Sequence, residues 1–318
     1  MRLPCALALM LICTAASAQA YPQRPIRILV GFPPGGGVDV LGRSIGPKMS
    51  ESLGQQIVVD NRVGAGGTLA SEITARAAPD GYTLVLVSAS HAVSASIYKK
   101  LGYDAVKDFS AISLVGSSPN VLLGHAETSP RSVPELIKVA RANPGALNYA
   151  SGGIGTTGHL SGELFNMQAG TKIFHIPYKG NPIALTDLIG GRVQLMFTTV
   201  PTALPQIQAG RVRALAVTSA KRFVVLPDTP TIAESGLPNY ESSNWFGMLA
   251  PRNTPAAIIT RLNAEIGKAL ANREVADAIL RQGAEPLAST PAQFATYLDA
   301  EVTKWAKTIQ ASGIRVEP

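Results

Sequence analysis

Hydrophobic residues after position 20 follow two alternating patterns, short β-branched runs and longer stretches with helical spacing. A short run predicts a buried strand, and apolar residues three and four positions apart predict one face of a helix. Their alternation is typical of α/β layering. The first series predicts strands at 26–30, 56–60, 82–87 and 109–116, and helices at 38–53, 69–77 and 92–101. Pro47 is expected to kink the first helix.

A second series of similar size follows. Ser132 and Glu135 have the spacing of a capping box and predict a helix at 133–142. Strands are expected at 147–150, 173–178, 193–198, 213–218 and 245–250, and helices at 160–167, 181–189 and 202–208. The C-terminal part is expected to be helical. Thr254-Pro255 and Thr290-Pro291 each combine an N-cap residue with a proline at the first helical position.

Two α/β series suggest two lobes, because the C-terminal helices are too few for a third domain. The simplest assembly returns those helices to the first lobe. Residues 21–120 and 242–318 then form lobe 1, and residues 121–241 form lobe 2. The chain crosses between the lobes near 117–122 and near 240–245, and a ligand cleft is expected between them.

Residues 1–20 have the pattern of a signal peptide. Arg2 supplies the positive end, an apolar stretch follows from Leu3 to Ala16, and small-x-small cleavage signals end at Ala18 and Ala20. Cleavage is expected after Ala20, with an uncleaved anchor as the alternative. Cys5 and Cys13 both lie inside this segment, so the mature chain has no thiol and no Cys-based metal site. We expect a soluble protein exported to the periplasm.

Composition narrows the class of protein further. The chain is 46% hydrophobic and 15% charged, which excludes a disordered polyelectrolyte. Its net charge is +7, but the basic residues stand singly or in isolated pairs, so no nucleic-acid partner is indicated. The four histidines show neither HxH nor HExxH spacing, and no metal or cofactor is expected.

The first candidate site is the loop GFPPGGGVD at 31–39, between a predicted strand and a predicted helix. Its glycines allow backbone N–H groups to approach a ligand closely, and the following helix start favours negative charge. It matches neither a Walker loop nor the dinucleotide fingerprint. A tight turn without a ligand is the alternative, and Asp39 could simply be a first-turn helix charge.

The second candidate loop, YASGGIGTTGH at 149–159, repeats this design in the other lobe. Both loops follow the carboxyl end of a predicted strand, which is where open α/β sheets bind ligands. His159 lies on this segment, and a histidine on the helix surface or packed in the interior is a more ordinary interpretation than one that faces the cleft.

Several motifs in register resemble the Bug family of extracytoplasmic solute receptors, the binding proteins of tripartite tricarboxylate transporters. They are GFPPGGGVD at 31–39, DNRVGAGG at 60–67, APDGYTL at 78–84, YASGGIGT at 149–156, PYKG at 177–180 and APRNTP at 250–255. The resemblance covers essentially the whole mature chain. It implies a two-lobed α/β periplasmic binding protein, type II-like, whose two glycine loops hold a ligand carboxylate through backbone amides, hydroxyls and ordered water.

The resemblance also implies which residues contact the ligand. The family's first ligand loop corresponds to Phe32, Pro34, Gly36 and Asp39, and its second loop to Ser151, Gly152, Gly155 and Thr156. Ser88 and Ser90 follow the third strand of lobe 1 and are expected in the same cleft, with Tyr178 and Lys179 on its wall. A solvated lysine is the alternative for Lys179, and Asn244 and Trp245 could be hinge or ligand residues.

The function expected is therefore a monomeric receptor that binds a small organic carboxylate in the interlobe cleft and delivers it to membrane transporter subunits. The alternatives are an exported α/β enzyme acting on a small carboxylate and a protein that presents its ligand to a sensor. The loops consist mainly of backbone donors, so the identity of the carboxylate stays open.

Overall fold

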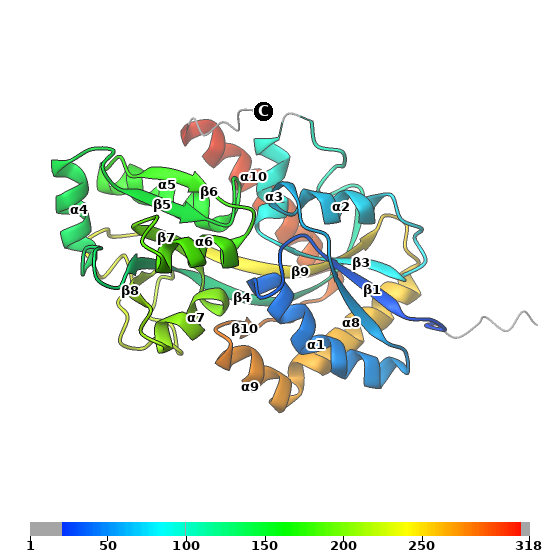
Figure 1. Ribbon diagram of the computed structural model, residues 1–318. Coiled ribbons are helices and arrows are strands. Elements are labelled where there is room, and N and C mark those ends of the chain that lie inside the picture. The colour runs from blue at the N-terminus through cyan, green and yellow to red at the C-terminus, as the bar shows by residue number, and fades with distance from the viewer. Residues whose placement is uncertain (1–20, 99, 313–318) are drawn as a thin grey trace, which may run out of the picture.

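The computed structural model describes residues 21–98 and 100–312, and its strands form two helix-covered groups (Figure 1). The expected signal peptide, with Cys5 and Cys13, lies outside the described residues. In the first group β1 (Ile26–Val30) lies between β2 (Ile57–Asn61) and β3 (Thr83–Ser88), all parallel. The helices that connect and follow these strands are α1 (Gly37–Leu53), α2 (Thr68–Ala75) and α3 (Ser90–Ile97).

The second group repeats this arrangement. β5 (Asn148–Ser151) lies between β6 (Phe174–Pro177) and β7 (Leu195–Thr199), again parallel. Its helices are α4 (Val133–Ala142), α5 (Thr157–Ala169), α6 (Asn181–Ile189) and α7 (Val200–Gln208), and β8 (Val212–Val217) completes the group. Each parallel strand in both groups is followed in the chain by a helix, as the α/β pattern predicts.

Two long antiparallel strands join the groups. β4 (Phe109–His125) pairs with β9 (Ser243–Pro251) over its first part and with β7 and β8 over its last part. The strands follow one path, β2-β1-β3-β9-β4-β7-β5-β6, with the short β10 (Glu285–Pro286) beside β4. The predicted end of the strand at residue 116 is therefore wrong. Residues 117–120 interrupt the apolar pattern, yet 117–119 continue the ladder with β9 and Asn120 begins the ladder with β7.

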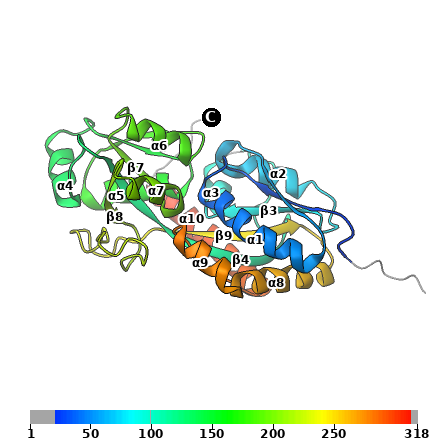
Figure 2. The same cartoon turned by 60° about the horizontal axis from the view of Figure 1, so that its bottom comes forward.

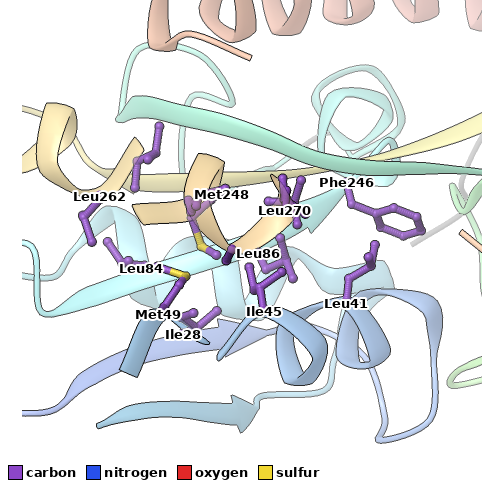
Figure 3. Packing of buried hydrophobic residues seen from close by; sticks show 14 of the residues in the cluster. Ile28, Leu41, Ile45, Met49, Leu84, Leu86, Phe246, Met248, Leu262 and Leu270 are labelled. Atoms are coloured by element: carbon purple, nitrogen blue, oxygen red, sulfur yellow. The ribbon is translucent and has the colours of Figure 1, made fainter. Parts of the chain in front are cut away.

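The core of the first group lies between its sheet and the helices α1, α8 (Ala256–Ala271) and α9 (Arg273–Arg281). Figure 3 shows α1 side chains meeting residues of β1, β3, β9 and α8. Its labelled members are Ile28, Leu41, Ile45, Met49, Leu84, Leu86, Phe246, Met248, Leu262 and Leu270. Burying each such side chain contributes about 1.5–3 kcal/mol, so this contact fixes α1, and with it the loop before α1, on the sheet.

The opposite face is covered by α2, α3 and the long α10 (Pro291–Ser312), which packs on α3 and β4. Figure 2 shows α10 near the middle of the molecule, where β4 and β9 cross between the two groups. Among the residues described, no helix is long and apolar enough to span a bilayer.

Helix boundaries agree with most of the sequence signals. Ser132 accepts the N–H of Glu135, and Thr290 and Gln293 form a reciprocal capping box. The expected cap at Thr254 is wrong, because α8 starts after Pro255 and the Thr254 hydroxyl donates to the Pro251 carbonyl instead.

Pro47 lies inside α1 without ending it. Ile45 and Met49, on either side of the proline, are both fully buried. Their packing against the sheet holds the helix together across the missing N–H.

Gly247 on β9 is a position where packing leaves no room for a side chain. A Cβ there would overlap the Phe294 ring, whereas a Cβ at Gly267 in α8 would meet nothing. We expect Gly247→Ala to lower the free energy of unfolding by about 1–3 kcal/mol through overpacking. The control Gly267→Ala should raise it by about 0.5–1 kcal/mol through helix propensity. Urea denaturation checks both, and equal midpoints for the two variants would contradict this account.

Candidate functional site

The N-terminal ends of four helices line one cavity between the two groups of strands. The cavity has about 430 Å³ of empty space, including the part open to solvent. Its lining includes Gly36, Gly37 and Val38 at the start of α1 and Thr156, Thr157 and Gly158 at the start of α5. Asn181 and Pro182 of α6 and Thr199 before α7 complete this set. The site is thus built from the carboxyl ends of strands in both groups, as expected for open α/β sheets.

Hydrogen bonds to the Asp39 carboxylate hold the first loop in its conformation. Its carboxylate accepts the Gly35 N–H at 2.9 Å and is bonded by Arg43 and Asn61, also at 2.9 Å. Burial alone would raise the pKa of Asp39, but these hydrogen bonds outweigh it and hold the pKa below its ordinary value. Gly35 has φ +80°, a conformation that favours glycine. Asp39 therefore positions the loop and is not among the residues that line the cavity.

The second loop is shaped by its own hydroxyls. Thr156 caps α5 by accepting the His159 N–H, and its hydroxyl donates to the Gly153 carbonyl at 2.7 Å. Ser151 is fully buried, and its hydroxyl donates to the same carbonyl at 3.1 Å. Gly153 and Gly155 have φ +132° and +77°, so both positions favour glycine.

The buried His159 and the half-buried His175 pack beside the second loop. The rings of His159 and His175 stack with centroids 4.2 Å apart. His159 Nδ1 accepts the Gly155 N–H at 3.2 Å, and His175 Nε2 pairs with the Ser151 hydroxyl at 2.7 Å. Burial lowers the pKa of His159 to about 4 and that of His175 to about 3. Both rings are therefore neutral at pH 7, and of the two ordinary interpretations for His159 the packed one holds.

Each of the two crossing strands carries a buried asparagine that holds part of the site. Asn120 on β4 accepts from the Thr157 hydroxyl at 3.4 Å and donates to Ser161 of α5 at 3.0 Å. Asn244 on β9 accepts the Ala89 N–H at 3.1 Å, between Ser88 and Ser90, and also lines the cavity. The Trp245 side chain is not part of the cavity lining, and its indole N–H donates to Glu301 of α10.

The cavity favours an anion without using a charged side chain. Within the described ranges 21–98 and 100–312, no Asp, Glu, Lys, Arg or His lines it. The first N–H groups of a helix have no acceptor inside the helix, and the helix dipole adds positive potential there. Gly37 and Val38 present such groups on one side, and Thr157 and Gly158 on the other. This is the electrostatic arrangement of an anion site.

The residues predicted from sequence fall into three sets. Phe32, Gly36, Ser88, Gly152 and Thr156 line this cavity together. Ser90 lines a smaller neighbouring cavity with Ser88, while Tyr178 and Lys179 line a larger one that shares Phe32 and Gly152. Pro34, Asp39, Ser151 and Gly155 do not line these cavities.

Sequence reasoning missed Gly37, Asn181, Thr199 and Phe246 in the lining. Thr199 ends β7, and Asn181 starts the helix that follows β6, so the strand-end rule used for the two glycine loops could have found them. Phe246 gives no such signal, because it looks like an ordinary core residue of β9. For the described part of the chain, no three His, Cys, Asp or Glu side chains gather into a possible metal site.

Solved structures of similar fold place the molecule among two-lobed periplasmic binding proteins. Rpa4515 of R. palustris with adipate matches with TM-score 0.90 and 38% identity, covering 93% of this chain and 99% of that one. The periplasmic binding protein BugD matches with TM-score 0.89 and 35% identity, covering 93% and 100%. MatC from Rhodopseudomonas palustris with bound malate matches with TM-score 0.85 and 32% identity, covering 91% and 100%.

The family follows from the sequence comparison. Residues 41–314 match the tripartite tricarboxylate transporter family receptor, and the chain belongs to this family. It is 39% identical over 308 residues to BugT of Bordetella pertussis, covering 96% of this chain and 94% of that protein. It is 42% identical over 296 residues to a UPF0065 protein from the tcbD-tcbE intergenic region of Pseudomonas sp. strain P51, covering 93% and 88%. The resemblance to Bug receptors is confirmed.

The stacked histidines predict how stability depends on pH. The pKa of a histidine in the unfolded chain is about 6.5, whereas in the folded protein the pKa of His159 is about 4 and that of His175 about 3. Between these values the unfolded state binds more protons, so the free energy of unfolding should fall as the pH is lowered from about 7 toward 4. His175→Gln should reduce that slope by up to about 1.4 kcal/mol per pH unit.

Urea denaturation at several pH values between 7 and 4.5 measures these slopes. His125→Gln is the matched control, because His125 is partly exposed at the end of β4 and outside the stack. A wild-type slope retained in His175→Gln would show that the stack does not carry the pH dependence.

Proposed function

We propose that this receptor binds a small organic carboxylate in the cavity between its lobes and delivers it to a tripartite tricarboxylate transporter in the membrane. The observation that carries the proposal is the convergence of the α1 and α5 starts on a cavity whose lining, among the described residues, contains no ionisable side chain. Adipate and malate in the two similar structures are both carboxylates, which supports the same class of ligand here.

The lining supplies donors for one carboxylate group. In the proposed complex, the amides of Gly37 and Val38 approach it from lobe 1 and those of Thr157 and Gly158 approach from lobe 2. The hydroxyls of Ser88 and Thr199 lie in the same lining and can donate as well. A charge-assisted hydrogen bond contributes about 1.5–3 kcal/mol, so a few of them suffice for micromolar binding.

Binding without catalysis fits the placement of the nucleophiles. Ser151 pairs with His175 and Ser71 pairs with His91 at 3.0 Å, but all four residues lie outside the lining of this cavity. The two hydroxyls are at most 1% exposed, so a bound acid would not reach them. The family and the similar structures are receptors and binding proteins, which agrees with this proposal.

For the lobes, we keep the boundaries 21–120 with 242–318 and 121–241. They agree with the pairing of β4, which changes from β9 to β7 and β8 near Asn120. We further propose that the chain is exported to the periplasm, cleaved after Ala20 and active as a monomer. Its partner would be the membrane subunits of the transporter or a sensor that reads the liganded form.

The test combines calorimetry with product analysis on adipate, malate and citrate. The wild-type protein should bind at least one of them and return it chemically unchanged. Gly36→Val should weaken that binding by at least about tenfold, because the added side chain occupies ligand space. Gly36 has φ −76°, which valine adopts without strain, and a Cβ there would lie 3.3 Å from the Pro33 carbonyl oxygen, so the variant should fold with a small adjustment of the loop. Bulk, and not the backbone strain that a left-handed glycine would imply, is therefore the expected cause.

Lys221→Ala on the exposed surface is the control and should bind as the wild type does. A folded Gly36→Val protein with wild-type affinity would remove the first loop from the site. Conversion of any of these acids into a product would favour the enzyme alternative.

Closure on the ligand is the second expectation. Gly37 of lobe 1 lies so close to Thr199 of lobe 2 that a Cβ would be 3.1 Å from its hydroxyl, and Gly180 lies against Pro33. Such contacts across the cavity describe a closed form, which a ligand stabilises because only closure brings both sets of donors to it. Small-angle scattering should show a smaller radius of gyration with saturating ligand. An identical profile with and without ligand would mean a preformed site.

A further inference from the structure

Four apolar side chains form a contact between the lobes, which we call the interlobe cluster. Val93 and Ile97 of α3 and Ile309 of α10 pack with Leu160 of α5, which belongs to the other lobe. At most 6% of each of these residues is exposed. Because the cluster combines residues from both lobes, its burial requires that the lobes stay together.

The interlobe cluster lies beside the second glycine loop and the larger cavity. A Cβ on Gly155 would be 3.2 Å from the Ile97 Cδ1 atom, so α3 rests directly on this loop. Tyr98 and Ile154 pack against the cluster and also line the larger cavity, which we call the outer cavity, in contrast to the inner cavity at the helix starts. Movement of the lobes away from each other must therefore separate α3 from the loop.

The helix α10 is fixed to the first lobe before its last turns reach the cluster. Phe294 is fully buried in the core of that lobe. The buried Glu301 carboxylate accepts the indole N–H of Trp245 on β9 at 2.9 Å and that of Trp305 at 3.1 Å. Ile309 lies about two turns further along the helix. Figure 1 shows these last turns of α10, in red, between the two lobes.

Opening of the cleft would expose the interlobe cluster to water. Leu160 would lose its contacts with α3 and α10, and the side chains of those helices would lose Leu160. The free energy of burying apolar surface scales with the area removed from water, and no ligand atom takes part in this contact. The cluster therefore favours the closed form in the empty protein as well.

We propose that the end of α10 acts as a clasp, which holds the lobes of the empty receptor together through Leu160 and sets the balance between its open and closed forms. A ligand then selects a closed form that is already populated. The clasp would raise the affinity for any ligand that requires closure, because apparent affinity scales with the fraction of the binding-competent form. For the described part of the chain, the four cluster residues line neither the inner nor the outer cavity, so this inference does not depend on the ligand.

Distance measurements between two spin labels on the empty protein test the clasp. Residues 21–318 contain no cysteine, so Glu51→Cys on α1 and Thr186→Cys on α6 place one label on each lobe. Both positions are exposed and lie outside the cluster. Without any added acid, the labelled protein should show a closed population at the separation of this structure and a second population at a longer distance.

Ile309→Ala and Leu160→Ala each remove three carbon atoms from the cluster. Each should lower the ratio of closed to open protein by about tenfold, since a buried carbon is worth about fourfold and each side chain keeps the contacts within its own lobe. The double variant should fall short of the product of the two effects, because both changes remove the same contact. Ile259→Ala is the matched control, because this isoleucine of α8 is similarly buried in the core of the first lobe and should leave the ratio unchanged.

Three results would overturn the clasp. They are a wild-type protein without the closed population, an Ile309→Ala protein with the wild-type distribution, and an Ile259→Ala protein that opens as much as Ile309→Ala. Circular dichroism shows whether each variant is folded. If Ile309→Ala does not fold, Ile309→Val takes its place with an expected shift of about two- to fourfold, and an unchanged ratio in that variant refutes the clasp. These outcomes leave the proposed binding of a carboxylate untouched, because no ligand enters the measurement.

Discussion

Unpaired amide N–H groups at helix starts are the constraint on which this structure depends. The α1 start has a glycine N-cap without a side-chain cap, and the α5 cap occupies only the N–H of His159. The remaining N–H groups need an acceptor from outside the helix, and both sets border one cavity. Asp39, Ser151 and Thr156 then serve to hold the loops so that these groups keep facing each other.

The crossing strands connect that site to the rest of the molecule. β4 and β9 pair with each other where they pass between the lobes, so the connection is a ribbon and not two free linkers (Figure 1). Asn120 and Asn244 stand on this ribbon and bond to the start of α5 and to the segment after β3. Trp245, next to Asn244, is bonded to α10 through Glu301. The start of α5 and the segment after β3 are therefore both bonded to the same ribbon.

Charge is distributed unequally along the cleft. The inner cavity uses partial charges of the backbone, which are fixed in place and cost no side-chain entropy on binding. Among the described residues that line the outer cavity, Lys179 carries a charge and the other side chains are uncharged.

Sequence alone determined the local elements and the class of the protein. The strand at 26–30 and the helices at 133–142 and 181–189 have the predicted bounds, because apolar periodicity, caps and proline positions act within a few residues. The two glycine loops were also visible, since strand, glycines and helix are adjacent in the chain.

Tertiary structure decided the rest. β4 continues past Gly116 because it pairs with β9 there. The two strands are more than a hundred residues apart in the chain, so no local sequence pattern could predict this ladder. Asp39 and Ser151, both candidate ligand contacts from sequence, bond to backbone of their own loops outside the cavity lining, and only packing shows which way such a side chain points. Asn181, Thr199 and Phe246 joined the cavity for the same reason. A site between two lobes is made of residues distant in sequence, so its lining is set by how the lobes meet.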